Sequence, residues 1–168
     1  MTFTFHKGKH RALPLYWLRW WPVLLNPMAI SRIVCFSFSA KYELNTDDQN
    51  DRNKLFGISY GGVHKNSARF AWRYDAQKNK FILSGYCYVN GTRIMEDICD
   101  VVANKKYDCI ILLHGLYYVF QVVQADNRYV LNTISIPKNN KKIGFLLGPF
   151  FGGNRPAPHT MSIQIKKV

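Results

Sequence analysis

Apolar and polar positions alternate along most of this chain, in short segments separated by Gly, Pro, Asn and Asp. In residues 67–74 the odd positions carry Ser, Arg, Ala and Arg, and the even positions carry Ala, Phe, Trp and Tyr. A period of two is typical of a β-strand with one buried face. The same pattern predicts strands at residues 2–6, 31–44, 54–60, 67–74, 80–89, 92–101, 108–114, 116–124, 129–136, 141–147 and 160–167.

Turn residues fall between these segments at regular intervals. Asn90-Gly91 is the strongest hairpin signal, because both residues tolerate the positive φ that a tight two-residue turn needs. No segment shows the spacing of an amphipathic helix. The sequence therefore predicts an all-β protein, an antiparallel jelly-roll-like β-sandwich of about ten strands.

The length of 168 residues and the apolar fraction of 48% fit one domain, spanning residues 1–168. Residues 1–30 are expected to be a largely irregular N-terminal segment that packs on the sandwich, with Trp17, Trp20 and Trp21 covering an end of the core or forming a stacking surface. Arg19 and the prolines of this segment exclude a membrane-spanning helix. Since residues 1–10 lack a signal-peptide pattern, a cytoplasmic location is expected, or a secreted or periplasmic one if a longer precursor is trimmed.

The chain is basic, with a net charge of +13. Such a charge permits an anionic partner, such as an acidic polysaccharide, a membrane surface or a nucleic acid. The basic residues are spread along the chain without a long run, and RNA-binding signatures are absent, so nucleic acid is the less favoured partner. The alternative is a basic surface that simply faces solvent.

Metal and cofactor chemistry is not indicated. The four cysteines match no zinc spacing and are expected to be buried, reduced thiols, although an even number leaves disulfides open in an oxidising compartment. His10, His64 and His159 lie in separate loops without the local spacing of a metal site. Asp47, Asp48 and Asp51 lack the spacing of a calcium loop, so a solvated loop is favoured there.

One candidate binding surface combines arginine and tyrosine on adjacent strands. Arg69 and Arg73 share one face of a strand, and Tyr86 and Tyr88 share a face of the next strand, so a hairpin would make them cross-strand neighbours. Arginine binds planar anions and tyrosine stacks on sugar faces. The alternative is an exposed sheet face on which these side chains cover one another. The rim of the surface is expected to carry His64, Asn154 and His159, the last two from the Gly/Pro-rich loop at 148–159.

The same residues permit proton transfer. His64 or His159 could act as a base with Tyr86 or Tyr88 as the acid, while arginine neutralises a uronate carboxylate. Sequence motifs for a serine nucleophile elbow, a phosphate-binding loop or a kinase are absent.

Three segments carry a resemblance to known proteins: NKLFGIS at 53–59, HKNSARFAWR at 64–73 and FFGGNRPAPH at 150–159. They are similar to a group of small uncharacterised bacterial β-sandwich proteins, over about residues 30–168. Similar jelly-roll sandwiches occur in polysaccharide lyases and carbohydrate-binding modules. The resembled group has no assigned activity, so the functional hypothesis rests on the arginine and tyrosine surface with the fold as an analogy: a carbohydrate-binding module, with an anionic glycan as one ligand class. A polysaccharide lyase or hydrolase, or a structural or protein-interaction domain, are the alternatives, and the oligomeric state stays open.

Overall fold

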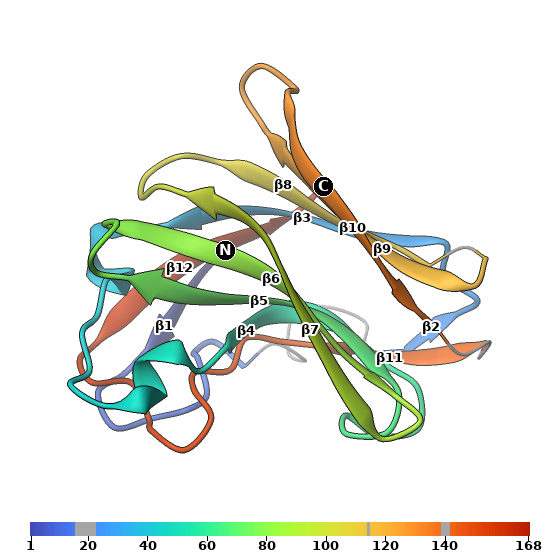
Figure 1. Cartoon of the computed structure of the whole chain (residues 1–168), viewed down its shortest axis with the longest axis horizontal. Helices are drawn as coiled ribbons and strands as arrows, with labels where there is room; N and C mark the ends of the chain where they lie inside the picture. The colour runs from blue at the N-terminus through green and yellow to red at the C-terminus, as the bar shows by residue number, and fades with distance from the viewer. Residues whose placement is uncertain (16–22, 114, 139–141) are drawn as a thin grey trace.

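The protein folds as two stacked antiparallel sheets of six strands each, in a computed structural model that describes residues 1–15, 23–113, 115–138 and 142–168. Figure 1 shows the two layers, with the N-terminal β1 beside the C-terminal β12. The first sheet has the order β1 (Thr2–Phe5), β12 (Met161–Lys167), β3 (Ala29–Phe36), β8 (Tyr107–Leu112), β9 (Tyr117–Gln124) and β10 (Val130–Pro137). The second has the order β2 (Val23–Leu25), β11 (Ile143–Leu147), β4 (Asn53–Ser59), β5 (Ser67–Asp75), β6 (Lys80–Val89) and β7 (Thr92–Val101).

The second sheet is organised around two hairpins. Strands β5 and β6 pair without interruption from Ser67 opposite Tyr88 to Asp75 opposite Lys80. Strands β6 and β7 are joined at Asn90-Gly91, whose φ angles of 51° and 84° confirm the predicted tight turn. A bulge in β7 adds Ile98 opposite the step from Leu83 to Ser84, and the freed Ile98 carbonyl accepts a hydrogen bond from Asn132 of β10 at 2.6 Å.

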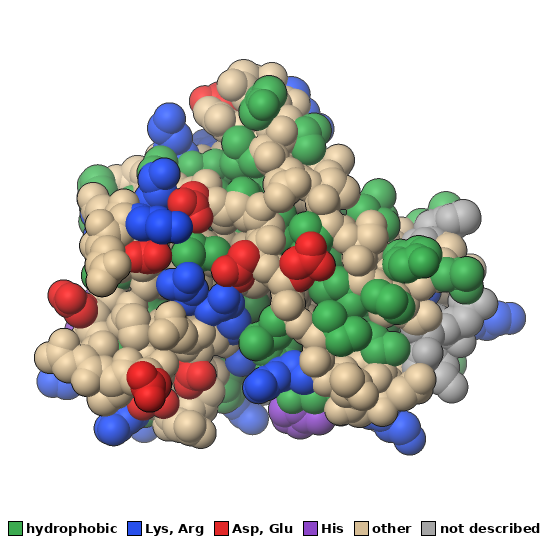
Figure 2. Space-filling view, viewed as in Figure 1, with side chains coloured by type: hydrophobic (Ala, Val, Ile, Leu, Met, Phe, Trp, Pro, Cys, Tyr) green, Lys and Arg blue, Asp and Glu red, His purple; other side chains and the backbone are tan. Residues whose placement is uncertain are grey.

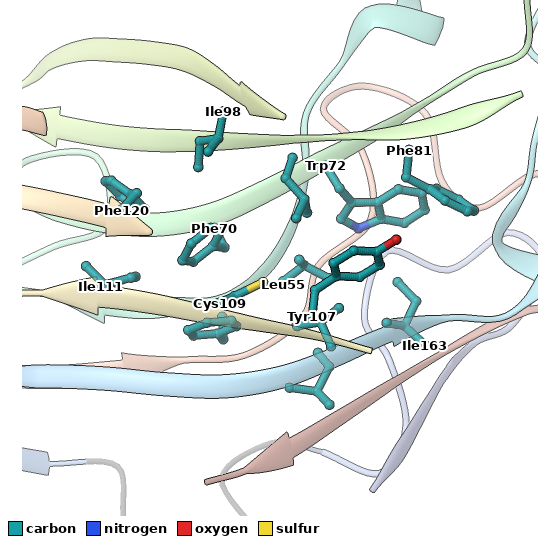
Figure 3. Close-up of a cluster of buried hydrophobic side chains, with 14 of the residues drawn as sticks. Leu55, Phe70, Trp72, Phe81, Ile98, Tyr107, Cys109, Ile111, Phe120 and Ile163 are labelled. Atoms are coloured by element: carbon teal, nitrogen blue, oxygen red, sulfur yellow. The ribbon is translucent and has the colours of Figure 1, made fainter. Parts of the chain in front are cut away.

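The core lies between the sheets and is rich in aromatic rings (Figure 3). Phe36 of the first sheet stacks on Phe81 of the second at 4.3 Å between ring centroids, and Trp72 packs against both rings. The even positions of β5 are buried, as the alternation predicts. The four cysteines are free, and Cys87 of β6 and Cys109 of β8 are fully buried.

The all-β antiparallel sandwich is confirmed, with twelve strands in the described residues. The strand expected at 31–44 is shorter than predicted, because β3 ends at Phe36 and a 3₁₀ turn, η2 (Phe38–Ala40), follows. The hydroxyl of Ser37 donates to the carbonyl of Ser162, which fixes the chain at this bend. A second 3₁₀ turn, η3 (Asp47–Asn50), occupies the acidic loop.

The N-terminal 30 residues contain more strand than expected. Besides β1, the segment thought to be irregular contributes β2, which pairs with β11. Trp17, Trp20 and Trp21 lie outside the described residues. Within the described ranges no helix is long and apolar enough to span a membrane.

Candidate functional site

The candidate site lies on the face of the β4–β7 sheet that points away from the core. Arg69 pairs directly with Tyr86 across the β5–β6 hairpin, and Tyr88 pairs with Ser67 on one side and Arg93 on the other. The predicted cross-strand pairing of arginine with tyrosine is therefore confirmed for Arg69 and Tyr86, whereas Arg73 pairs with Ile82. Lys54 of β4 reaches the same face because it pairs with Ala71, an outward position of β5.

These strands form the floor of a cavity of about 690 Å³. Its walls come from segments distant in sequence: the chain after β11, the N-terminal segment around Arg11 and the loop before β5 that carries His64. Four arginine and lysine side chains line it, Arg11, Lys54, Arg69 and Arg93, and none of its described lining residues is acidic. The cavity is therefore basic, with tyrosine rings in its floor.

A glycine makes room for Arg69. Gly57 of β4 lies opposite Arg69, and a Cβ at Gly57 would lie 2.7 Å from the Arg69 Cα and 2.9 Å from its Cγ, and would also strike the Ala68 carbonyl oxygen. The Arg69 side chain can therefore lie across β4 only because residue 57 has no side chain.

Lys54 is the most buried cation of the site, with 9% of its surface exposed. Its ammonium lies 4.6 Å from the centre of the Tyr86 ring and 3.5 Å from the Gly152 carbonyl oxygen. Burial above all, together with the positive charge of Arg69, lowers the Lys54 pKa to about 8, while the charge of Asp51 acts in the opposite direction. The Lys54 amine therefore titrates in the range in which proteins commonly work.

Arg69 and the tyrosines complete the floor. Burial lowers the pKa of Arg69, and its Nε is buried with no hydrogen-bond partner among the described residues. The rings of Tyr86 and Tyr88 lie 5.9 Å apart, and the His64 ring meets Tyr88 edge-on at 5.1 Å. Burial raises the pKa of Tyr86, so this phenol stays protonated at neutral pH.

The wall after β11 is held in place by backbone and side-chain contacts. Phe150 and Lys54 exchange two backbone hydrogen bonds, and the Asn53 side chain accepts one from the Gly152 N–H. The Nδ1 of His10 lies 2.8 Å from the Phe151 carbonyl oxygen, and its ring stacks on Phe150. The Gly/Pro-rich loop is thus fixed over the sheet, and it brings Asn154 to the cavity.

Five of the seven predicted site residues line this cavity: His64, Arg69, Tyr86, Tyr88 and Asn154. The structure does not bring Arg73 or His159 to it. Arg73 lies four residues beyond Arg69 on the same face and pairs with Asp75 at 3.7 Å. The Nε2 of His159 lies 2.9 Å from the Ser39 carbonyl oxygen, at a different part of the molecule. Arg155 of the same loop pairs with Asp48.

Lys54, Arg93 and Gly57 were not anticipated. Arg93 could have been found by counting the hairpin register outward from Asn90-Gly91, which places it opposite Tyr88. Lys54 gave no such signal, because a register shift next to it changes the alternation of β4.

Charges on the rest of this sheet face are balanced. Arg52 pairs with Asp97 at 2.8 Å and Lys80 pairs with Asp100 at 3.8 Å. Figure 2 shows basic and acidic side chains interspersed over this part of the surface. Among the described residues there is no group of three or more His, Cys, Asp and Glu side chains that could hold a metal ion. The cavity therefore differs from the rest of this sheet face, because its described lining contains basic side chains and no acidic ones.

No protein-family model matches this sequence, and no curated protein sequence matches it. Solved structures do resemble it. The alginate lyase from Klebsiella pneumoniae matches with a TM-score of 0.61 and 8% identity over 83% of this chain, which spans 59% of that enzyme. The alginate lyase AlyC3 matches with a TM-score of 0.61 and 10% identity, over 99% of this chain and 72% of the enzyme.

A functionally unknown protein from Saccharomyces cerevisiae matches with a TM-score of 0.53 and 11% identity, over 87% of this chain and 72% of that one. This protein has the jelly-roll-like β-sandwich fold of these structures. That confirms the expected likeness in fold to polysaccharide lyases, and at such low identities it shows the fold alone.

Proposed function

We propose that this protein binds an acidic oligosaccharide in the cavity on the β4–β7 sheet. The observation that carries the proposal is the composition of the cavity: buried or half-buried Lys54 and Arg69 beside Tyr86 and Tyr88, with no acidic residue in the described lining. Guanidinium and ammonium groups bind carboxylate and sulfate, and tyrosine rings offer flat apolar surfaces against which a sugar ring can pack.

The size and placement of the cavity support a small ligand. Its volume of about 690 Å³ lies within the usual range for ligand pockets, and its floor is built on strands, which hold side chains more rigidly than loops do. Two structures with this fold are named alginate lyases, and alginate is a polyuronate. Uronate oligosaccharides are therefore the first ligands to test.

Arg69 and Arg73 form a matched pair for the test, because both lie on the outward face of β5 and only Arg69 lines the cavity. We expect Arg69→Met to weaken binding of an alginate oligosaccharide by at least about tenfold, because it removes a desolvated charge from the site. Arg73→Met should change the affinity by less than about threefold. Isothermal titration calorimetry measures both.

Two results would count against the proposal. Equal losses in the two variants would show that the ligand does not use the cavity. Absence of binding to acidic and neutral oligosaccharides alike, together with a change in oligomeric mass for Arg69→Met, would favour the protein-interaction alternative instead.

A polysaccharide lyase is the second candidate, and the contact between His64 and Tyr88 favours it. In such a reaction a base removes the proton next to the uronate carboxylate, a cation stabilises the resulting negative charge, and the glycosidic oxygen leaves with a proton from an acid. Lysine and arginine in the floor supply the cations. Ultraviolet absorbance of an unsaturated uronate product, lost in His64→Gln or Tyr88→Phe, would establish that the protein is a lyase. Binding of the oligosaccharide without formation of that product would support a non-catalytic binding module instead.

A further inference from the structure

Lys54 combines burial with the lack of an ion pair among the described residues. Arg52, Arg73, Lys80, Arg128 and Arg155 each pair with an aspartate. Lys54 is 9% exposed and forms no ion pair within the described part of the chain. A buried ammonium is normally paired, because removing it from water costs free energy that a counter-charge offsets.

The direct contacts of Lys54 are not with a carboxylate. Its ammonium faces the Tyr86 ring and the Gly152 carbonyl, and among the neighbouring charges the positive Arg69 opposes the charged form of Lys54 more strongly than Asp51 favours it. Arg69 in turn has an Nε that donates no hydrogen bond to any described residue. Lys54 and Arg69 thus line one cavity, and one guanidinium donor of Arg69 is unused among the described residues.

We propose that Lys54 and Arg69 form a subsite that binds the anionic group of the ligand, a carboxylate or a sulfate, and that Lys54 sets the preference for acidic over neutral sugars. The inference rests on the proposed function and narrows it to the part of the cavity floor between β4 and β5. Gly57 supports this geometry, since it allows the Arg69 side chain to lie on β4 beside Lys54. The bound anion supplies the direct ion pair that Lys54 does not form with any described residue.

The subsite has a pH dependence that follows from its composition. A bound anion favours charged Lys54 and raises its pKa above the value of about 8 in the free protein, so binding takes up a proton. Affinity is then highest when Lys54 is charged and falls as the pH rises past about 8. The titratable and charged groups around Lys54 come from every segment that surrounds it. They are Asp51 of the preceding loop, Arg69 of β5, Tyr86 and Tyr88 of β6, Arg93 of β7, Arg11 of the N-terminal segment and His64 of the loop before β5.

The test uses the full chain and three oligosaccharides of one length: an alginate fragment, a sulfated fragment and a neutral one. Lys54→Met removes the charge, Lys54→Arg keeps a charge that does not titrate, and Lys80→Met is a control at a paired lysine of the same sheet. Calorimetry from about pH 7 to about pH 9 gives the affinities, and thermal melts confirm that each variant is folded.

We expect wild-type affinity for at least one acidic fragment to fall about tenfold across that range, following the charged fraction of Lys54. Lys54→Met should bind that fragment about tenfold more weakly at neutral pH, and Lys54→Arg should bind with little pH dependence. Lys80→Met should match the wild type. The fragment whose affinity depends on Lys54 identifies the group as carboxylate or sulfate.

Two outcomes would overturn the inference in different ways. If wild type binds an acidic fragment with a flat pH profile, or if Lys54→Met binds it normally, the subsite assignment is wrong while the proposed function stands. If no fragment binds at any pH, the proposed function fails and the subsite with it.

Discussion

At the scale of single residues, Lys54 combines a candidate role in binding with a penalty in stability. Its pKa is about 8 in the folded chain against an ordinary value of 10.5, so the unfolded chain binds the proton more tightly. The charged lysine therefore opposes folding below about pH 8, and the opposition fades as the pH rises toward 10.5. Binding and stability thus make opposite demands on this side chain.

We predict that Lys54→Met stabilises the free protein at neutral pH by up to about 3 kcal/mol. This is the free energy that corresponds to the difference between the pKa of Lys54 in the unfolded and the folded chain. The advantage over wild type should shrink between about pH 8 and about pH 10.5, because wild type loses its buried charge there. Urea unfolding across this range measures it. A variant less stable than wild type at neutral pH would contradict the prediction.

How far the sequence predicts the site also depends on single residues. The contact of Arg69 with Tyr86 follows from two adjacent alternating strands and a hairpin. The difference between Arg69 and Arg73 does not, because it is made by walls that come from residues 146–154 and the N-terminal segment, far away in the chain. Local periodicity assigns both arginines to one face, and only tertiary structure separates them.

At the scale of elements, β4 is shaped by the absence of a side chain at residue 57. We predict that Gly57→Ala lowers the free energy of unfolding by about 1–3 kcal/mol, because the added Cβ would strike the backbone of β5. It should also weaken binding of the acidic fragment, since Arg69 must move. Thermal melts and calorimetry on one preparation measure the two effects, and an unchanged affinity would show that the position of Arg69 is not needed for binding.

Elements defined by local signals were predicted best. Strands β6 and β7 have the bounds that the alternation around Asn90-Gly91 indicates. In contrast, β2 has three residues and exists through its pairing with β11, more than a hundred residues later. No local pattern marks such a strand, because it is defined by its partner.

At the scale of the whole molecule, aromatic contacts across the core join the sheets, and Trp72 is central to them. It is fully buried and packs against Phe36, Tyr42, Phe81 and Phe151. We predict that Trp72→Ala costs about 3–5 kcal/mol of stability. Trp72→Phe should cost clearly less, since the indole Nε1 has no hydrogen-bond partner among the described residues. Chemical denaturation compares the two, and equal losses would contradict this account.

The sandwich itself could be predicted from the alternation, whereas the order of its strands could not. Strand β3 lies between β12 and β8, and β4 lies between β11 and β5. Which strands become neighbours depends on how the whole core packs, and a short segment of the sequence does not carry that information. The fold class is thus a local property of this chain, and its topology is a global one.

The contact at the β7 bulge also affects how copies of the chain meet one another. Strands β7 and β10 end their respective sheets, and an exposed end strand can pair with a neighbouring molecule and start aggregation. Here the bulge interrupts the regular row of backbone groups along β7, and the Ile98 carbonyl already accepts a hydrogen bond from the Asn132 side chain of β10. A hydrogen bond that joins the two layers thereby also guards against fibril-like growth along this side.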